Sequence, residues 1–438
     1  MTRLNRRYLQ GITLLVASFL VLPGCESEAN PPAQAPQVAC APGNGGITLP
    51  EGFCAVVVSD SVGRARHIDV AANGDVFLAM NNTRGPDREL IPGGVALLRD
   101  LDDDGKADEV HRFGENGGNE VLLSKEALWF ATDDAILRYA FPQGATGPVG
   151  TPDTIVSGLP NEANHRAKSL ALGASGELFV NIGSPSNACQ EQPRGVGSPG
   201  IDPCPQLETR AGIWRFDSNR TGQKQADGVR YATGLRNTVA LRLHPSGALF
   251  GVIHGRDQLS ALWSDLYTTE ESAEKPSEEF VRIEEGDDFG WPYCYHDPDS
   301  DTKVLAPEYG GDGSRIGRCS DAKDPLVDFP AHWAPNDLEF YTGSQFPEKY
   351  RGGAFVAFHG SWNRSPSPQG GYNVIFVPFQ GTVPTGEWEV FADGFAGDDV
   401  SPSGADHRPV GLAVGPDGSL YISDSQQGAV WKVIYTGE

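Results

Sequence analysis

Three stretches of this chain share one pattern: HRAKSLALGASG at residues 165–176, RNTVALRLHPSG at 236–247 and HRPVGLAVGPDG at 407–418. Each begins with two polar residues, continues with an apolar run typical of a buried strand, and ends on a glycine eleven positions after the first polar residue. A second apolar run follows each glycine, as in Leu178-Phe179-Val180. A pattern repeated at this scale indicates units that stack or that surround an axis.

Six such units can be followed along the chain. Period-two alternation and turn residues mark their segments as short strands, and helical periodicity is nearly absent. Four-stranded units separated by glycine turns predict an all-β fold, a six-bladed β-propeller, although seven blades are also compatible with the repeats. Long insertions at 184–209 and 255–279 are expected to cover one face of it. The units begin at or near Arg66, Val121, His165, Arg236, Asn336 and His407.

In a propeller the innermost strand of each blade lines a central channel. The residues just before that strand therefore stand at one mouth of the channel. The shared register predicts that His165, Arg236 and His407, together with Gly63-Arg64 of the first unit, surround a common opening, which is a candidate active site. The alternative is that these polar pairs are turn and capping residues, satisfied by backbone groups.

Composition restricts the class of protein. The chain has 438 residues, room for one large domain or two ordinary ones. Its 54 Gly and 33 Pro show no period of three, which excludes collagen. The formal charge of −24 and the lack of a basic stripe argue against nucleic acid as a partner and indicate a soluble, acidic surface.

The first residues resemble a bacterial lipoprotein signal. Basic residues precede an apolar run from Leu9 to Leu22, which is short for a membrane span, and Leu22-Pro23-Gly24-Cys25 follows. We predict a signal peptide over 1–24, a lipid on Cys25, a flexible tether over 25–39 and the propeller over 40–438. The resemblance implies export and anchoring at the bacterial outer membrane or in the periplasm. An ordinary secretion signal is the alternative.

The remaining six cysteines are consistent with export. An even number suggests disulfides, and nearest neighbours (40–54, 189–204 and 294–319) would each close a short loop. We favour that pairing, although six cysteines allow others. Zinc is disfavoured because no Cys-x-x-Cys pair is present, and the absence of a Cys-x-x-Cys-His motif disfavours a covalently attached haem.

Several short words then occur in a characteristic order. They resemble those of the soluble pyrroloquinoline quinone (PQQ) dependent sugar dehydrogenases, and more closely the sorbosone dehydrogenase branch. The similarity spans about residues 45–436 and implies a six-bladed propeller, PQQ, a calcium ion and an external electron acceptor, a quinone or a cytochrome. The words are Asn164-His165-Arg166, Gly234-Leu235-Arg236-Asn237, Gly255-Arg256-Asp257, Phe289-Gly290-Trp291-Pro292, Gly360-Ser361-Trp362-Asn363-Arg364 and His407-Arg408-Pro409-Val410.

The resemblance also implies roles for individual residues. His165 matches the general base that takes a proton from the sugar hydroxyl, a task suited to histidine. Arg236 matches the arginine that polarises the reacting quinone oxygen. The carboxylates of PQQ call for cations around them, and calcium is held partly by backbone carbonyls. The implied cofactor residues are Arg236, Asn237, Arg364, His407 and Arg408, and the implied carbonyl ligands are those of Gly255 and Arg256.

A second calcium site is suggested by the residues themselves. The run from Asp100 to Asp108 places acidic residues at positions 1, 3, 5 and 9 and glycine at position 6 of a calcium loop. Asp100, Asp102, Asp104 and Asp108 are the candidate ligands. The glutamate expected at position 12 is replaced by His111, so an acidic hairpin turn is an equal alternative.

Two departures from the family pattern concern the cofactor and the sugar. Ser184 stands where glucose-specific members have an aspartate, and Asp406 stands where they have an arginine. Asp406 would repel PQQ unless it turns away or pairs with His407. Two other functions remain open: a calcium-dependent sugar lactonase, disfavoured because the register positions are His and Arg, and a binding propeller without catalysis.

Overall fold

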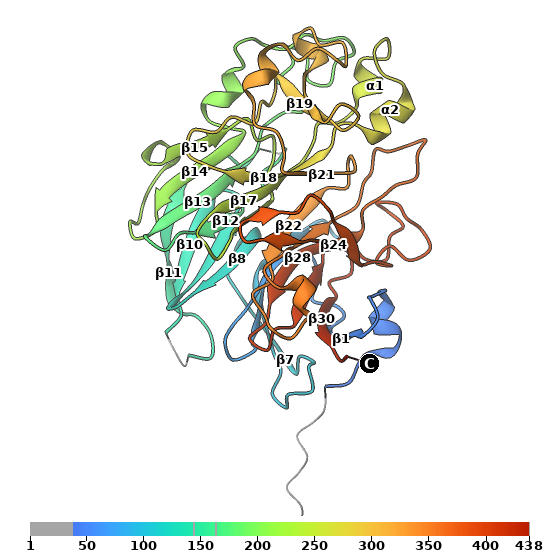
Figure 1. The fold of residues 1–438 in the computed structure, drawn as a ribbon. Helices are drawn as coiled ribbons and strands as arrows, with labels where there is room; N and C mark the ends of the chain where they lie inside the picture. The colour runs from blue at the N-terminus through green and yellow to red at the C-terminus, as the bar shows by residue number, and fades with distance from the viewer. Residues whose placement is uncertain (1–37, 143–144, 163, 438) are drawn as a thin grey trace, which may run out of the picture. The chain divides into compact units, whose positions relative to one another are not determined.

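The computed structural model describes residues 38–142, 145–162 and 164–437 (Figure 1). They form six four-stranded antiparallel sheets, which confirms the predicted six-bladed propeller. The predicted signal peptide, Cys25 and most of the tether lie outside the described residues. No helix in the described part is long and apolar enough to cross a bilayer.

The first strand of each blade is the innermost one. Blade 1 contains β2 (Ala65–Val70), β3 (Val76–Met80), β6 (Gly94–Arg99) and β7 (Glu109–Phe113). Blade 2 contains β8 (Gly118–Ser124), β9 (Ala127–Thr132), β10 (Ala135–Ala140) and β11 (Val149–Ser157). Blade 3 contains β12 (Leu170–Leu172), β13 (Glu177–Ile182), β14 (Gly212–Asp217) and β15 (Val229–Thr233).

The remaining blades follow the same plan. Blade 4 contains β16 (Ala240–Leu243), β17 (Leu249–Ile253), β18 (Glu278–Ile283) and β21 (Val327–Phe329). Blade 5 contains β22 (Pro335–Phe340), β23 (Ala354–Phe358), β24 (Asn373–Val377) and β27 (Glu389–Ala392). Blade 6 contains β28 (Pro409–Val414), β29 (Leu420–Asp424), β30 (Val430–Tyr435) and β1 (Phe53–Ser59).

The repeated glycines explain why the innermost and second strands form hairpins. Gly176, Gly247 and Gly418 have φ of 98°, 89° and 83°, in the region that favours glycine. The strands on either side then pair in register, as Leu170 with Val180 and Ala240 with Val252. All these turns lie at one end of the innermost strands, so the polar pairs that precede the strands lie at the other end, at the mouth.

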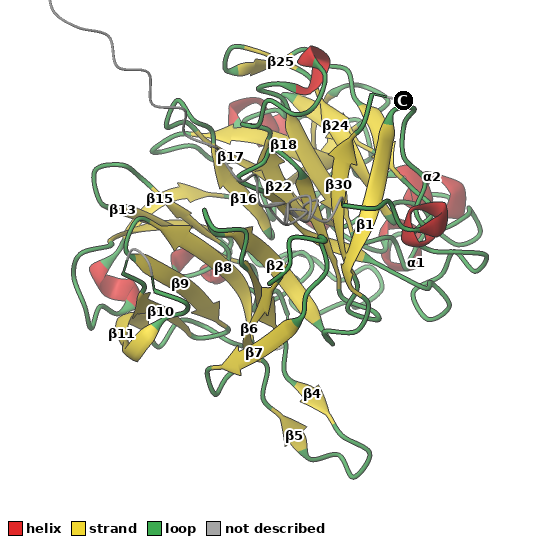
Figure 2. Ribbon diagram, turned by 90° about the horizontal axis from the view of Figure 1, so that it is seen from below, coloured by secondary structure: helices red, strands yellow, loops and turns green. Residues whose placement is uncertain are grey.

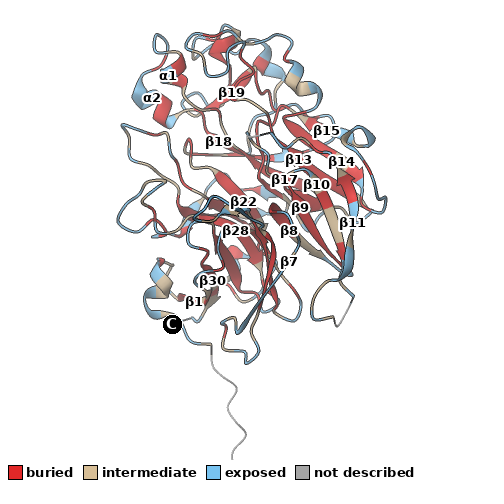
Figure 3. Cartoon of the chain, turned by 180° about the vertical axis from the view of Figure 1, so that it is seen from behind, coloured by how far each residue is buried: buried red, intermediate tan, exposed pale blue. Residues whose placement is uncertain are grey.

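Blade 6 is closed by a strand from the opposite end of the described chain. β1 pairs with β30, from Phe53 opposite Tyr435 to Ser59 opposite Val430. Phe53 of β1 also packs between blades 5 and 6, where its ring meets those of Phe346, Tyr350 and Phe391 edge-on. Phe53 belongs to a cluster of buried residues from blades 5 and 6, and most of the residues in the strands are buried (Figure 3). The circle of blades is therefore closed both by the pairing of β1 with β30 and by aromatic packing.

The long insertions cover the mouth end, as predicted. Two short helices, α1 (Leu259–Leu262) and α2 (Thr269–Glu274), and the hairpin of β19 (Cys294–Asp297) and β20 (Thr302–Leu305) lie beyond the sheets (Figure 1). The three disulfides join residues 40 to 54, 189 to 204 and 294 to 319, which confirms the predicted pairing. One of them lies within the insertion at 184–209, and another closes the segment of the β19–β20 hairpin, so both stabilise this covering layer.

Two smaller hairpins stand outside the blades. One, of β4 (Thr83–Arg84) and β5 (Leu90–Ile91), projects from blade 1 (Figure 2). The other joins β25 (Phe379–Gln380) to β26 (Val383–Pro384) on blade 5.

Candidate active site at the mouth of the channel

Four of the predicted residues come shortly before the innermost strands of their blades: His165, Arg236, Asn237 and Arg408. Gly183 shows how tightly the first three are grouped: a methyl group there would lie 2.5 Å from the His165 Cβ and 2.9 Å from the Asn237 Oδ1. The Ser184 amide also donates to the Arg236 carbonyl at 2.8 Å. The residues predicted from the repeats of blades 3 and 4 are thus neighbours in space.

His165 is oriented by Ser184. Its Nδ1 lies 2.8 Å from the Ser184 carbonyl oxygen and 3.0 Å from the Ser184 hydroxyl oxygen. The carbonyl can only accept, so Nδ1 carries the proton and Nε2 keeps its lone pair. Burial, and then the Arg236 guanidinium, lower the pKa of His165 to about 3. A neutral imidazole with a free Nε2 is the protonation state that a general base requires.

Arg236 is held almost completely by the protein. Its guanidinium donates to the Gly255 carbonyl at 2.8 Å and to Asp257 Oδ2 at 2.9 Å. Two further bonds go to the carbonyl and the side-chain oxygen of Asn187. Burial alone would raise the pKa of Asp257, but Arg236 and its other cationic neighbours lower it to about 2. Four bonds leave one N–H of Arg236, on Nη1, for a ligand.

Asn237 presents an oxygen without a partner. Its Nδ2 lies 2.9 Å from His254 Nδ1, and His254 Nε2 lies 2.7 Å from the Pro335 carbonyl. Nε2 therefore carries the proton of His254, and Nδ1 accepts from the Asn237 amide. The Asn237 Oδ1 is buried and makes no hydrogen bond among the described residues. A buried acceptor left in this state requires a ligand or an ordered water.

Two arginines from blades 6 and 1 supply unpaired positive charge. Arg408 donates to the carbonyls of His359 at 2.8 Å and Gly360 at 2.9 Å, through Nε and Nη2. Arg66 donates through Nε to Asn119 Oδ1 at 2.9 Å. Within the described residues, neither guanidinium forms an ion pair with a carboxylate. Burial lowers the pKa of Arg66 to about 10, with a contribution from Arg408. We call the group of Arg66, His165, Arg236, Asn237 and Arg408 at the mouth the basic cluster.

Sequence reasoning missed Arg66 because this residue lies inside β2, after the register position of the polar pairs. That register placed Gly63 and Arg64 at the mouth, whereas Arg66 lies where the pairing of β2 with β3 shifts between Ala65 and Ile68. A bulge adds a residue and re-aims its side chain. Similar shifts at the mouth ends of β8 and β22 involve Asn119 and Asn336. Asn187 and Asp257 do not belong to the repeated pattern. The sequence feature that could have indicated them is their position in the two long insertions, which were expected to cover this face.

Three other predicted residues have different surroundings. The Nδ1 of His407 lies 2.9 Å from the buried Asp424, and its ring packs edge-on against Trp431. Asp406 is exposed and does not pair with His407. The Arg364 guanidinium donates to the carbonyls of Ala273 and Ala331 at 2.7 and 2.9 Å, and it contacts Glu274. Arg364 thereby joins loops of the covering layer.

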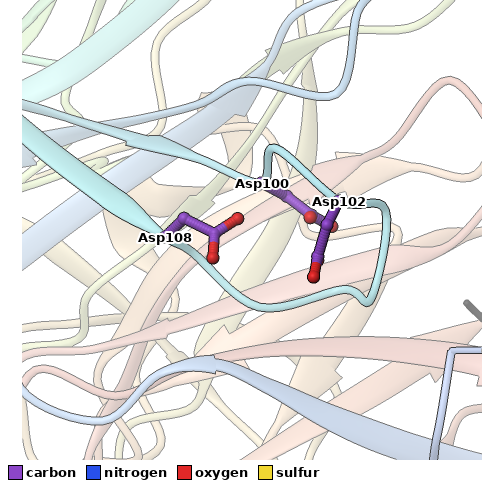
Figure 4. Close-up of side chains that lie close together, drawn as sticks. All are labelled: Asp100, Asp102 and Asp108. Carbon is purple, nitrogen blue, oxygen red and sulfur yellow. The ribbon is translucent and has the colours of Figure 1, made fainter.

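The two predicted calcium sites lie at opposite ends of the channel. The Gly255 carbonyl at the mouth already accepts from Arg236, and the Arg256 side chain pairs with Glu308. The acidic loop joins β6 to β7 at the far end, where Asp100, Asp102 and Asp108 bring ligand oxygens within 4.8 Å of one another (Figure 4). Asp104 does not join that group, and its carboxylate accepts from the Lys106 amide at 2.8 Å.

Comparisons with known proteins agree with the six-bladed fold. The PQQ domain of pyranose dehydrogenase from Coprinopsis cinerea superposes with a TM-score of 0.69 at 20% identity, covering 89% of this chain and 97% of that one. A Trichoderma reesei enzyme of Carbohydrate-Active Enzymes Family AA12 gives 0.70 at 20% identity, over 91% and 99%. At these identities the likeness shows the fold.

Sequence relatives are matched over part of their length. The PQQ-dependent pyranose dehydrogenase of Coprinopsis cinerea is 28% identical over 54% of this chain and 37% of its own. An uncharacterised protein of Borreliella burgdorferi is 29% identical over 47% of this chain and 48% of its own. The chain thus spans half or less of the curated relatives that it matches. The family model described as TrAA12-like matches residues 47–436, nearly all of the propeller, and the chain belongs to that family.

Proposed function

We propose that this protein is a PQQ-dependent sugar dehydrogenase. The observation that carries the proposal is the basic cluster, where Arg66 and Arg408 keep guanidinium N–H groups without partners and without an ion pair among the described residues. A ligand with several carboxylates fits such a cluster, because charged donors bind carboxylates strongly. Membership of the TrAA12-like family supports the same conclusion.

The residues present fit the cofactor in one further respect. The unpartnered Asn237 Oδ1 supplies an acceptor for a ring N–H or a hydroxyl. Gly183 lets His165 and Asn237 lie close together, since a Cβ there would collide with both. Arg66, Arg408 and Asn237 would hold the cofactor. PQQ, when bound, supplies an acceptor for the two electrons and the hydrogen removed from a sugar carbon.

The protein's own contribution is to move one proton and to stabilise one negative charge. The His165 Nε2 is free to take the proton of a sugar hydroxyl, while Ser184 holds the ring through Nδ1. The remaining N–H of Arg236 can donate to an oxygen on which negative charge develops. Asp257 and Asn187 fix that guanidinium, so no reorganisation is needed during the reaction.

The direct test is a titration of the purified chain with PQQ, with and without calcium. We expect one PQQ per chain at micromolar concentration and reduction of a dye by at least one aldose or aldosone. A chain that binds no PQQ at that concentration, in either condition, is not a PQQ enzyme. The sugar oxidised, the sorbosone-type specificity, lipid attachment at Cys25 and the quinone or cytochrome acceptor stay predictions.

The lactonase alternative is disfavoured by the placement of acidic groups. Among the described residues, the one group of three carboxylates close enough to bind a metal is that of Asp100, Asp102 and Asp108, at the far end of the channel. At the mouth, Asp257 is engaged with two arginines, Arg236 and Arg194. A hydrolase centred on a carboxylate-bound calcium would require acidic side chains at the mouth itself.

A further inference from the structure

Trp362 is unusual among the aromatic residues of the protein. Its exposed fraction is 53%, and no other aromatic side chain in the described part of the chain is classed as exposed. A single exposed leucine or valine is ordinary on a protein surface, but tryptophan is strongly buried on average. An exposed tryptophan beside a candidate active site therefore calls for an explanation.

The loop that carries Trp362 is rigidly mounted. It connects β23 to β24, and its Ser361 is fully buried. The Ser361 amide donates to the Gly370 carbonyl at 2.8 Å, and the Tyr372 hydroxyl donates to the Ser361 carbonyl at 2.7 Å. On the other side of the tryptophan, Arg364 is bound to the carbonyls of Ala273 and Ala331. The exposure of Trp362 is thus built into the fold and does not come from a frayed loop.

The same loop contacts the basic cluster at two points. The Gly360 carbonyl accepts from Arg408 at 2.9 Å. Three residues later, the Asn363 amide donates to Asp257 Oδ1 at 3.0 Å, and the other oxygen of Asp257 binds Arg236. Trp362 lies in the backbone between these two anchors, at the rim of the channel mouth. The next residue, Asn363, has a buried Oδ1 without a partner among the described residues.

We propose that Trp362 is a binding platform for the sugar, on which the apolar C–H face of a pyranose ring stacks. The inference rests on the proposed function and deepens it, since it assigns the substrate contact at the rim. Aromatic rings with a few convergent polar groups are the usual lining of a small-molecule site. One isolated ring offers too little apolar surface for a stable protein partner, whereas a single sugar covers it.

The platform has a specific kinetic signature. A contact at the rim, away from the reacting carbon, is made equally in the ground state and in the transition state, so its loss raises KM and leaves kcat unchanged. For Trp362→Ala we expect KM to rise about 10-fold or more, kcat to stay within about 3-fold, and PQQ affinity to be unchanged. The KM of Trp362→Phe should lie between those of wild type and Trp362→Ala, because phenylalanine keeps a smaller aromatic ring.

The experiment measures sugar binding as well as turnover. Calorimetry of the chain without PQQ, against D-glucose, D-mannose, D-galactose and D-glucosone, would be run on wild type, Trp362→Ala and the exposed control Val390→Ala. Weaker binding of a sugar by Trp362→Ala alone, at an unchanged melting temperature, is the expected result. Equal binding by wild type and Trp362→Ala overturns the inference, and so does the absence of binding to all four sugars by wild type.

The two proposals fail in different ways. If wild type binds no PQQ but binds a sugar through Trp362, the proposed oxidation is wrong and the platform stands. If wild type binds PQQ and oxidises a sugar, but Trp362→Ala has an unchanged KM, the platform is wrong and the proposed function stands.

Discussion

The mouth of the channel and its interior are built from the same six strands, yet they treat charge in opposite ways. In the interior, His67 Nδ1 lies 2.8 Å from Glu120 and its Nε2 lies 2.6 Å from the Asn336 carbonyl. Arg242 binds Glu339 at 2.8 Å and the Leu338 carbonyl at 3.0 Å. At the mouth, Arg66 and Arg408 keep unpaired N–H groups, and Asn237 keeps an unpaired oxygen.

This difference separates a structural polar network from a candidate binding site. A buried network is stable when its members satisfy one another, and an unpaired member costs free energy. The interior follows that rule at most positions, with the buried Glu120 Oε1 as an exception, so its charges hold the innermost strands together. The mouth departs from it at several positions at once, which is expected where a ligand completes the hydrogen bonds.

The largest expected effect is on catalysis at the mouth. His165→Ala removes the proposed base, and we expect kcat to fall by about 10²- to 10⁴-fold while PQQ binds as before. Dye reduction and a PQQ titration on the same preparation measure the two quantities. An unaltered kcat would refute the assignment of His165.

Removing a charge from the interior should destabilise the fold instead. Arg242→Met leaves Glu339 buried without its partner, and we expect the free energy of unfolding to fall by about 3–5 kcal/mol. Urea unfolding measures this, with the more exposed pair of Arg215 and Glu285 as the control, where Arg215→Met should cost about 1 kcal/mol or less. A variant that unfolds like wild type would show that the interior charges are not a stabilising network.

Removing a charge from the mouth should weaken PQQ binding with little effect on stability. For Arg408→Gln we expect the PQQ dissociation constant to rise about 10- to 100-fold, the value of one or two charged hydrogen bonds.

Arg364→Gln sharpens this prediction, because the sequence places Arg364 at the cofactor and the structure binds its guanidinium to loop carbonyls. We expect that variant to lose stability and to keep its PQQ affinity. Equal loss of PQQ affinity in both variants would erase the distinction between unpaired and paired arginines.

The pH dependence tests the partner of His165. Ser184→Asp places a carboxylate beside Nδ1, which favours the imidazolium and should raise the pKa of His165 by about 1–3 units. The base is then lost at a higher pH, so the acid limb of the kcat/KM profile should move upward. Ser184→Ala should not move it in that direction. A Ser184→Asp profile that coincides with wild type would contradict the orientation of His165 by Ser184.

The smallest expected effect concerns the acidic loop at the far end. If it binds calcium with a dissociation constant of roughly 0.1–1 mM, 1 mM calcium adds about 0.4–1.4 kcal/mol to the free energy of unfolding. Thermal unfolding with calcium and with a chelator measures the gain. Asp102→Asn should remove it, and a variant that responds like wild type would leave the loop as an acidic turn.

The repeats predicted the fold and part of the site, for reasons that individual residues illustrate. The repeats revealed His165, Arg236 and Arg408, because the number of residues between the polar pair and the turn glycine is the same in blades 3, 4 and 6. Arg66 was missed because it lies inside β2, three residues after the register position of Gly63, at a shift in the pairing that leaves no sequence pattern. Asp257 was missed as the residue that holds Arg236, because a contact between side chains leaves no periodic trace. The role of β1 was missed since its partner β30 is nearly the whole chain away.

That pairing has a consequence for the order of assembly. The circle of blades stays open while the chain is being made, because β1 finds its neighbour only when residues 430–435 have emerged. Until then Phe53 lacks its contact with Tyr435, whose ring centroid lies 4.9 Å from its own. Deletion of residues 430–435 would therefore open the circle of blades, whereas cleavage of a surface loop would leave the circle closed.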